Sequence, residues 1–481
     1  MNALIFLDFL NAYLWNMFAL FSTAETVKFA RGYEFFTPID IMATFFGFCV
    51  LTILAYIRSR NNKGQDYYKY YMRAFLFKLL FTYANAAFYI IFYNGGGDSI
   101  AFWDGSVKLN NLFFEKPMAY FDEMWNNYPK EHLRVNFNSI TGYPDGRVYE
   151  EGASFFVSKI ASVFGFFTFK GYILMSLVFA YITANASWRL YELVIEHKLH
   201  SNWHAALAIL FIPSLSFWCG GISKDTIMWV CVCYFIVHLN QVISPEKKSR
   251  FKNWLIMLIC LYVFFRVRSF MLMTVVGPLV FAYSASVGRK KGRKSTNARF
   301  VRFLAFTSVA VGILGFFQSS IGSEFLAEAQ IIYEDMTTNK TYGDKRYTLG
   351  DVSYTPLGMM AAFPMSVVAG FYRPFIWEAL GVTLILNGIE SMVLLYYTYR
   401  FFTGPKIAQR IQRIRSNELL IYGFAFAVIL AFFAGFTSIL FGVLIRFKAP
   451  VLPFLVLVLT AHYRPEREEK EAKEAEMELR G

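Results

Sequence analysis

Long apolar runs, separated by short polar segments, recur along the whole sequence. The clearest runs occupy 39–56, 74–93, 171–188, 203–220 and 223–242. Each has about 20 residues, the length that an α-helix needs to cross the hydrocarbon core of a bilayer. Apolar and polar positions do not alternate within these runs, which disfavours a closed β-barrel. The pattern predicts an all-α, polytopic integral membrane protein with about 11–12 transmembrane helices.

The composition agrees with this class and limits the partners. Hydrophobic residues make up 56% of the 481 positions and charged residues 17%, whereas a soluble protein of this length needs more polar surface. The net charge of +13 does not indicate nucleic acid, because most basic residues lie in short segments between apolar runs, as in cytoplasmic loops. We therefore expect membrane lipids, and no nucleic acid, as partners. The five cysteines lie in or beside apolar runs, as small core residues do.

The distribution of charge assigns the segments to the two sides of the membrane. The strongly basic segment 289–302 is predicted to be cytoplasmic. Residues 94–152 and 321–355 contain more acids than bases, so we predict that they form two long loops on the outer face. A single transmembrane domain is expected over 1–463, followed by a charged cytoplasmic tail at 464–481.

For three other apolar stretches, length alone does not decide whether they cross the membrane. If 153–169 and 356–372 crossed the membrane, the later basic loops would change sides. The first carries Lys159 in mid-run, and we expect it to be an interfacial helix on the outer face. The second is expected to be a re-entrant or interfacial segment on that face. Residues 3–22 fit both spanning and lying in the interface, and spanning is favoured.

The segment 94–109, Asn-Gly-Gly-Gly-Asp-Ser-Ile-Ala-Phe-Trp-Asp-Gly-Ser-Val-Lys-Leu, has the composition of a binding or catalytic site. Three glycines, which let a backbone approach a ligand closely, precede Asp98. A plain tight turn is an equal alternative for these glycines. A carboxylate at this position can deprotonate a hydroxyl group or hold a divalent cation. We predict Asp98 as the catalytic residue at the foot of an outer loop, with Asp104 as the second candidate.

Basic residues at the ends of other apolar runs are predicted to reach the same face. Such residues often anchor helices at lipid headgroups, but several of them converging with acids favour a site. Arginine binds a diphosphate through two hydrogen bonds and lysine as a point charge. Trp103 can stack on a sugar ring or belong to the aromatic belt of the membrane. The candidate substrate-binding residues are Trp103, Lys224 (beside Asp225), Arg266, Arg268, Arg373 and Arg446.

The sequence Gly-Gly-Asp-Ser-Ile-Ala-Phe-Trp at 96–103 resembles the first outer loop of membrane glycosyltransferases that use polyprenyl-linked sugars (the GT-C type). In that loop an acid is followed by an aromatic residue. The chain also resembles bacterial polysaccharide and O-antigen polymerases. Weaker similarities are 213–218 followed by 223–225, the turn 372–375, and Arg446 upstream of two prolines. The resemblance covers most of the chain as architecture and only these patches as sequence. The acidic loop follows the second clear run here and the first span in the GT-C enzymes.

The resemblance implies a function in the assembly of cell-surface polysaccharide. Sugars would be transferred or polymerised from a polyprenyl-(di)phosphate-linked donor to a glycan acceptor at the outer face of a bacterial inner membrane. Asp98 would be the base or the ligand of a divalent cation. Two alternatives remain open. A transporter or flippase of a lipid-linked or anionic substrate would need charged residues within spans, of which Asp40, Lys78 and Glu390 are candidates, and usually an internal repeat, which is not visible. A non-enzymatic envelope-assembly protein would use the charged tail.

Overall fold

The computed structural model describes residues 35–198, 200–243, 250–279, 320–338, 346–350, 353–379, 381–404 and 407–461. Over these ranges the regular secondary structure is helical, apart from an isolated bridge between Arg346 and Leu440. Six helical segments in this part of the chain are long and apolar enough to cross a membrane. The chain is therefore an all-α, multi-pass membrane protein, which confirms that part of the prediction.

The six candidate spans differ in how much of their surface faces the rest of the protein. Only 6% of the residues in the most apolar window of α2 are buried, against 72% in α20. The surface of α2 is thus available to lipid, whereas α20 is a central helix. The spans are α2 (Pro38–Asn61), Asp66–Phe92 with α3 (Tyr71–Ala87), α9 (Tyr172–Glu196), α12 (Lys224–Ile243), α20 (Glu418–Thr437), and Phe441–Thr460 with α21 (Phe441–Lys448) and α22 (Leu452–Thr460).

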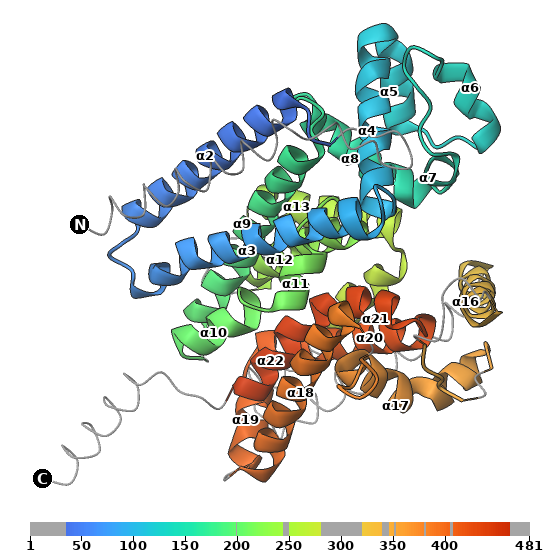
Figure 1. Ribbon diagram of the computed structural model, residues 1–481. Helices are drawn as coiled ribbons and strands as arrows, with labels where there is room; N and C mark the ends of the chain where they lie inside the picture. The colour runs from blue at the N-terminus through green and yellow to red at the C-terminus, as the bar shows by residue number, and fades with distance from the viewer. Residues whose placement is uncertain are drawn as a thin grey trace, which may run out of the picture.

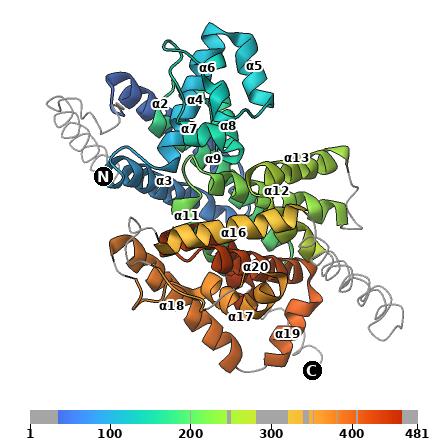
Figure 2. The ribbon, with the colours of Figure 1, turned by 90° about the vertical axis from the view of Figure 1, so that its right-hand side faces the viewer.

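Figures 1 and 2 show two groups of helices, one above the other. The upper group contains α2, α3, α9, α12 and α13 (Phe251–Val267). The lower group contains α17 (Pro356–Tyr372), α18 (Val382–Thr403), α20, α21 and α22. The short α19 (Ile407–Ser416) connects α18 to α20.

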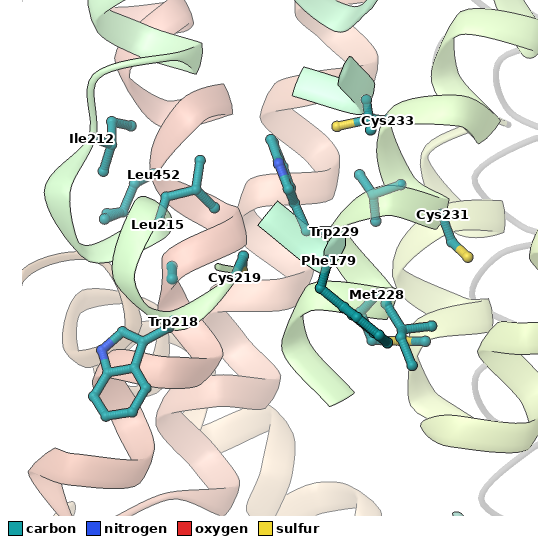
Figure 3. Packing of buried hydrophobic residues seen from close by; sticks show 14 of the residues in the cluster. Phe179, Ile212, Leu215, Trp218, Cys219, Met228, Trp229, Cys231, Cys233 and Leu452 are labelled. Carbon is teal, nitrogen blue, oxygen red and sulfur yellow. The ribbon is translucent and has the colours of Figure 1, made fainter. Parts of the chain in front are cut away.

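Two short helices, α10 (Asn202–Ile209) and α11 (Pro213–Trp218), join the groups. The helix α10 contacts α9 and α22, and α11 contacts α3 and α21. Apolar side chains fill this junction, where Leu215 lies next to Leu452 (Figure 3). The expectation that the cysteines are core residues holds here: Cys219, Cys231, Cys233 and Cys260 are buried, and Cys49 is partly buried.

The run 203–220 is not one spanning helix, contrary to our prediction. The helix α10 ends at Ile209, and α11 starts at Pro213. Proline lacks the N–H group that would continue the helix, and it forces the preceding residue out of the α conformation. Ile212 accordingly has an extended backbone, with ψ at 118°. The two pieces nevertheless run along the span Asp66–Phe92, from Trp203 beside Tyr70 to Gly220, whose backbone oxygen accepts a hydrogen bond from Thr82.

The predicted outer loop 94–152 is largely helical. Its main helix, α4 (Asp98–Glu115), packs against α8 (Gly152–Gly165). Glycines allow this close approach, because a Cβ atom on Gly105 would lie 2.6 Å from Oγ of Ser158, and one on Gly165 would lie 2.0 Å from Oδ1 of Asn110. The shorter helices of the unit are α5 (Pro117–Trp125), η3 (Lys130–His132), α6 (Leu133–Asn136) and α7 (Gly146–Glu150). Part of the second predicted outer loop is helical too, as α16 (Ser320–Thr338).

Both stretches that we expected not to span form short helices. The helix α8 has 14 residues and α17 has 17, which correspond to about 21 Å and 26 Å, less than the roughly 30 Å of a hydrocarbon core. Their interfacial or re-entrant placement stays a prediction. Residues 3–22, the basic segment 289–302 and the tail 464–481 lie outside the described residues.

Candidate functional site

Asp98 is the first residue of α4, directly after the glycine turn. The φ angles of Gly95 and Gly97 are 72° and 84°, in the left-handed region that glycine tolerates best. A Cβ atom on Gly97 would also lie 2.9 Å from the ring of Tyr89. The predicted turn is thus confirmed, but Asp98 starts a helix, where a carboxylate interacts favourably with the helix dipole.

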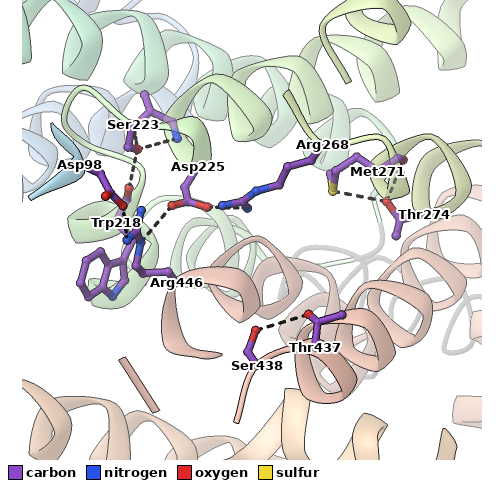
Figure 4. A network of polar contacts seen from close by, with 11 residues as sticks. Asp98, Trp218, Ser223, Asp225, Arg268, Met271, Thr274, Thr437, Ser438 and Arg446 are labelled. Atoms are coloured by element: carbon purple, nitrogen blue, oxygen red, sulfur yellow. Dashed lines mark hydrogen bonds and ion pairs between the residues drawn. The ribbon is translucent and has the colours of Figure 1, made fainter. Parts of the chain in front are cut away.

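Four charged side chains form a continuous series of ion pairs, which we call the Asp–Arg chain (Figure 4). Arg446 donates from Nη1 to Oδ2 of Asp98 at 3.0 Å and from Nε to Oδ2 of Asp225 at 3.3 Å. Nη1 of Arg268 lies 2.7 Å from Oδ1 of Asp225. These residues come from α4, α21, α12 and the segment that follows α13. The structure therefore brings three predicted site residues together, with Asp225 at the centre.

The Asp–Arg chain runs from an exposed end to a buried one. The side chain of Asp98 is 56% exposed, and that of Asp225 only 1%. A buried carboxylate is costly unless cations compensate it, and two arginines do so here. The Arg446 guanidinium lies 5.5 Å from the Trp218 ring centroid, and that of Arg268 lies 4.1 Å from the ring of Phe447. These rings hold the arginines in place and leave the Asp98 carboxylate accessible.

The turn between α11 and α12 sets the position of Asp225. Oγ of Ser223 accepts a hydrogen bond from the backbone N–H of Thr226, as a helix N-cap does. The Thr226 hydroxyl in turn donates to the carbonyl oxygen of Gly221 at 2.6 Å. A Cβ atom on Gly221 would lie 2.6 Å from Oδ1 of Asn85, so only glycine fits against α3 at this point. The turn thereby fixes the start of α12, and with it Asp225.

Lys224 and Arg266 lie beside the Asp–Arg chain but contact other groups. Nζ of Lys224 forms an ion pair with Oε1 of Glu151, at the start of α8. Nη2 of Arg266 donates to Oδ1 of Asn127 at 3.0 Å, and its guanidinium lies 5.3 Å from the Phe156 ring centroid. Lys224 directly precedes Asp225 in the sequence, and Arg266 is two residues before Arg268. Both contact residues in α8 or at its start.

Trp103 and Asp104 are turned away from this cluster. Nε1 of Trp103 donates to the backbone oxygen of Lys170 at 2.7 Å, and its ring packs against Phe35 and Tyr172. Asp104 pairs with Lys108 at 3.3 Å, and its side chain is 7% exposed. Treating the segment as a loop ignored helical periodicity, in which residues five or six positions after Asp98 point in other directions. The predicted stacking and second catalytic acid lack the exposure that those roles need.

Arg373, at the end of α17, belongs to a separate group of contacts. Its Nε lies 3.4 Å from Oε1 of Glu378, and its guanidinium lies 4.8 Å from the Tyr347 ring centroid. The backbone oxygen of Arg373 accepts a hydrogen bond from Nζ of Lys448 at 2.9 Å. Lys448 is two residues from Arg446, so Arg373 lies near α21 without joining the Asp–Arg chain.

The arrangement suits anions better than a metal ion. Within the described ranges, no group of three or more His, Cys, Asp and Glu side chains is placed to hold a metal. Each carboxylate of the Asp–Arg chain already has an arginine partner. A divalent cation would therefore need ligands from its substrate, since the two exposed carboxylates here, Asp98 and Glu151, are each paired with a cation.

Two residues that organise this region, Asp225 and Lys159, were not among the site residues predicted from the sequence. Asp225 was noticed only as a neighbour of Lys224, and Lys159 only as a charge within an apolar stretch. The signal for Lys159 was present, because a lysine in the middle of an apolar run needs a polar partner. It has two: Nζ donates to the Asn126 backbone oxygen at 2.6 Å and to Oδ1 of Asn127 at 3.0 Å.

Comparison of the chain with protein-family models, curated proteins and solved structures gives no match. Any assignment of function therefore depends on the site itself: an accessible carboxylate, a buried carboxylate and several cations, at the ends of apolar helices.

Proposed function

We propose that the chain transfers sugars from a polyprenyl-(di)phosphate-linked donor, as a glycosyltransferase or polysaccharide polymerase at the outer face of a bacterial inner membrane. The observation that carries this proposal is the Asp–Arg chain. An exposed Asp98 is held by Arg446, and the same arginine is held from behind by buried Asp225. A general base and anion-binding groups are thus in contact at the ends of apolar helices.

The proposed reaction assigns Asp98 the role of general base. An acceptor hydroxyl oxygen attacks the anomeric carbon of the donor sugar and gives its proton to the Asp98 carboxylate. The bond between that carbon and the phosphate oxygen breaks, and the lipid diphosphate leaves with the bonding electrons. Among the described residues Arg446 donates through Nη1 and Nε. Its Nη2 group therefore has hydrogens for a phosphate oxygen.

A matched pair of variants tests this proposal. In a strain that lacks the gene, Asp98→Asn should abolish the surface glycan, because an amide cannot take the acceptor proton. Asp66→Asn, which changes an exposed aspartate that contacts Lys69 and Asn202, should leave the glycan unchanged. Glycan is scored on a gel, at equal protein level in the membrane. Full-length glycan with Asp98→Asn would refute the proposal, and loss of long chains with short units retained would select a polymerase.

Transport is the second candidate, and buried lysines favour it. Lys78 lies within the span Asp66–Phe92 and is 5% exposed, with one long hydrogen bond, 3.5 Å, to the Leu215 oxygen. Lys448 is fully buried in α21. Charges at membrane depth often mark a transport path. Uptake of a labelled lipid-linked or anionic substrate by liposomes containing the purified protein, without any sugar transfer, would favour this alternative.

A further inference from the structure

Two cations meet at one uncharged oxygen beside the Asp–Arg chain. Lys159 of α8 and Arg266 of α13 both donate to Oδ1 of Asn127, each at 3.0 Å. Lys159 also donates to the backbone oxygen of Asn126. We call Lys159, Arg266 and Asn127 the cation pair site. The helices α8 and α13 contact each other, so packing of the two helices holds the pair together.

The positive charge of this site has no ion-pair partner among the described residues. Lys159 is 1% exposed, and a buried cation is normally paired. The two carboxylates that act on it through space are Glu123 and Asp122, and Asp122 accepts its hydrogen bonds from Asn126 and Tyr128. Oε1 of Glu123 accepts hydrogen bonds from Tyr149 and Asn136 instead. The Asp–Arg chain, in contrast, alternates carboxylate and guanidinium.

Without a bound anion, the positive charges of Lys159 and Arg266 repel each other. A bound anion would reduce this repulsion. Burial lowers the pKa of Lys159 to about 8, and the nearby positive charge of Arg266 adds to this effect, while Glu123 opposes it. Two like charges that share one amide oxygen repel each other. Nε of Arg266 also has no hydrogen-bond partner among the described residues, although it is buried. The hydrogen-bonding capacity of the Arg266 guanidinium is therefore not fully used within the described residues.

The cation pair site is continuous with the Asp–Arg chain. Arg266 and Arg268 are separated by one residue at the end of α13. On the other side, a Cβ atom on Gly152 would lie 2.7 Å from Nδ2 of Asn127, so Asn127 packs directly against the start of α8. The preceding residue, Glu151, pairs with Lys224, the neighbour of Asp225. The two connections lead from the uncompensated charge to the Asp–Arg chain, one through Arg268 and the other through Lys224, the neighbour of Asp225.

We propose that Lys159 and Arg266 form the binding site for the diphosphate of the lipid-linked substrate. The partly exposed Arg266 contacts the phosphate, and the buried Lys159, joined to it through Oδ1 of Asn127, adds a second positive charge. This assignment rests on the proposed function and sharpens it. The Asp–Arg chain positions the base and offers Nη2 of Arg446 to one phosphate oxygen, and the uncompensated cations beside it bind the rest of the leaving group. Phosphate oxygens are the acceptors that a lysine and an arginine together bind well.

Binding of inorganic pyrophosphate to the purified full-length protein in detergent tests the site. Lys159→Gln and Arg266→Gln should each weaken binding at least tenfold, because each removes one of the two positive charges that attract the anion. Arg266→Lys should retain more affinity than Arg266→Gln, since it keeps the charge. Lys69→Gln, at an exposed lysine paired with Asp66, is the control and should bind as the unmodified protein does. Size-exclusion profiles and thermal unfolding identify variants that fail to fold.

The source of the phosphate is distinguished with three probes: pyrophosphate, polyprenyl diphosphate, and vesicles that contain phosphatidylglycerol. Binding of the first two that depends on Lys159 and Arg266 supports the site. Binding of the vesicles alone would overturn it, because the two residues would then be a headgroup anchor. Unchanged pyrophosphate binding by folded Lys159→Gln and Arg266→Gln would overturn it as well.

Asp98→Asn separates this inference from the proposed function. It should abolish the glycan and leave pyrophosphate binding intact, which supports both. If Asp98→Asn keeps the glycan while pyrophosphate binding still depends on Lys159, the proposed function fails, and with it the assignment of the site to a leaving group. If Asp98→Asn loses the glycan while folded Lys159→Gln and Arg266→Gln bind pyrophosphate normally, only the cation pair site fails.

Discussion

The Asp–Arg chain and the cation pair site are neighbours, but their charges are balanced in opposite ways. In the first, Asp225 is buried between Arg268 and Arg446, so the structure itself supplies the counter-charge. In the second, Lys159 and Arg266 share an amide oxygen and have no paired carboxylate among the described residues. The difference separates charges that the fold needs from charges that are free to bind a ligand.

The largest effect is expected from removing Asp225, the buried carboxylate at the centre of the Asp–Arg chain. Asp225→Ala leaves Arg268 and Arg446 without their buried partner, which should cost about 3–5 kcal/mol of unfolding free energy. Asp66→Ala, which breaks an exposed pair with Lys69, should cost less than about 1 kcal/mol. Chemical unfolding in detergent measures both. Similar losses for the two variants would show that the charges of the Asp–Arg chain are not coupled to the fold.

A smaller effect is expected when residue 446 keeps its positive charge but can no longer bond two carboxylates at once. Arg446→Lys can contact either Asp98 or Asp225, whereas arginine bonds both. Sugar transfer should fall by about a hundredfold, equivalent to about 2.7 kcal/mol. The readout is the initial rate with a lipid-linked donor. A rate within threefold of the original would mean that positive charge alone suffices at this position.

The smallest effect is a pH dependence of stability that arises from Lys159 in the cation pair site. Burial lowers the pKa of Lys159 to about 8 from its ordinary 10.5, so between these values the unfolded chain binds the proton that the folded chain lacks. Stability should therefore rise with pH over this interval, by less than about 1 kcal/mol per pH unit.

Thermal unfolding between pH 7.5 and 10.5 measures this slope, and Lys159→Met is its control. The neighbouring charged groups are Glu123, Asp122 and Arg266; carboxyl groups ordinarily titrate below this range, and burial raises the pKa of nearby Tyr149. The variant should lose the slope that Lys159 causes. A slope that persists in Lys159→Met would assign it to another group.

The sequence was sufficient to predict much of the fold and part of the site. Membrane class and helical content follow from run length, which is a local property. Asp98, Arg268 and Arg446 were found because charges at the ends of apolar runs are conspicuous. Their mutual contacts were not predictable, because the pairing through Asp225 depends on how α12 and α21 meet.

The errors have local physical causes. Pro213 starts a new helix inside an apolar run, after α10 has ended at Ile209, and counting hydrophobic residues alone does not register that interruption. Trp103 was placed in a loop, whereas the helix that starts at Asp98 rotates it into the core. Lys159 was regarded as a sign of an amphipathic surface, because its partners, Asn126 and Asn127, follow α5 some thirty positions earlier.

The ion pair between Asp98 and Arg446 joins residues 348 positions apart, which has a consequence for biosynthesis. At about 5–20 residues per second, a ribosome adds Arg446 roughly 20–70 s after Asp98. Asp225 and Arg268 are made in the meantime, so half of the site exists before the last partner arrives. A nascent or truncated chain that lacks α21 therefore has no complete Asp–Arg chain, and Asp98 gains its arginine partner only once nearly all of the protein has been made.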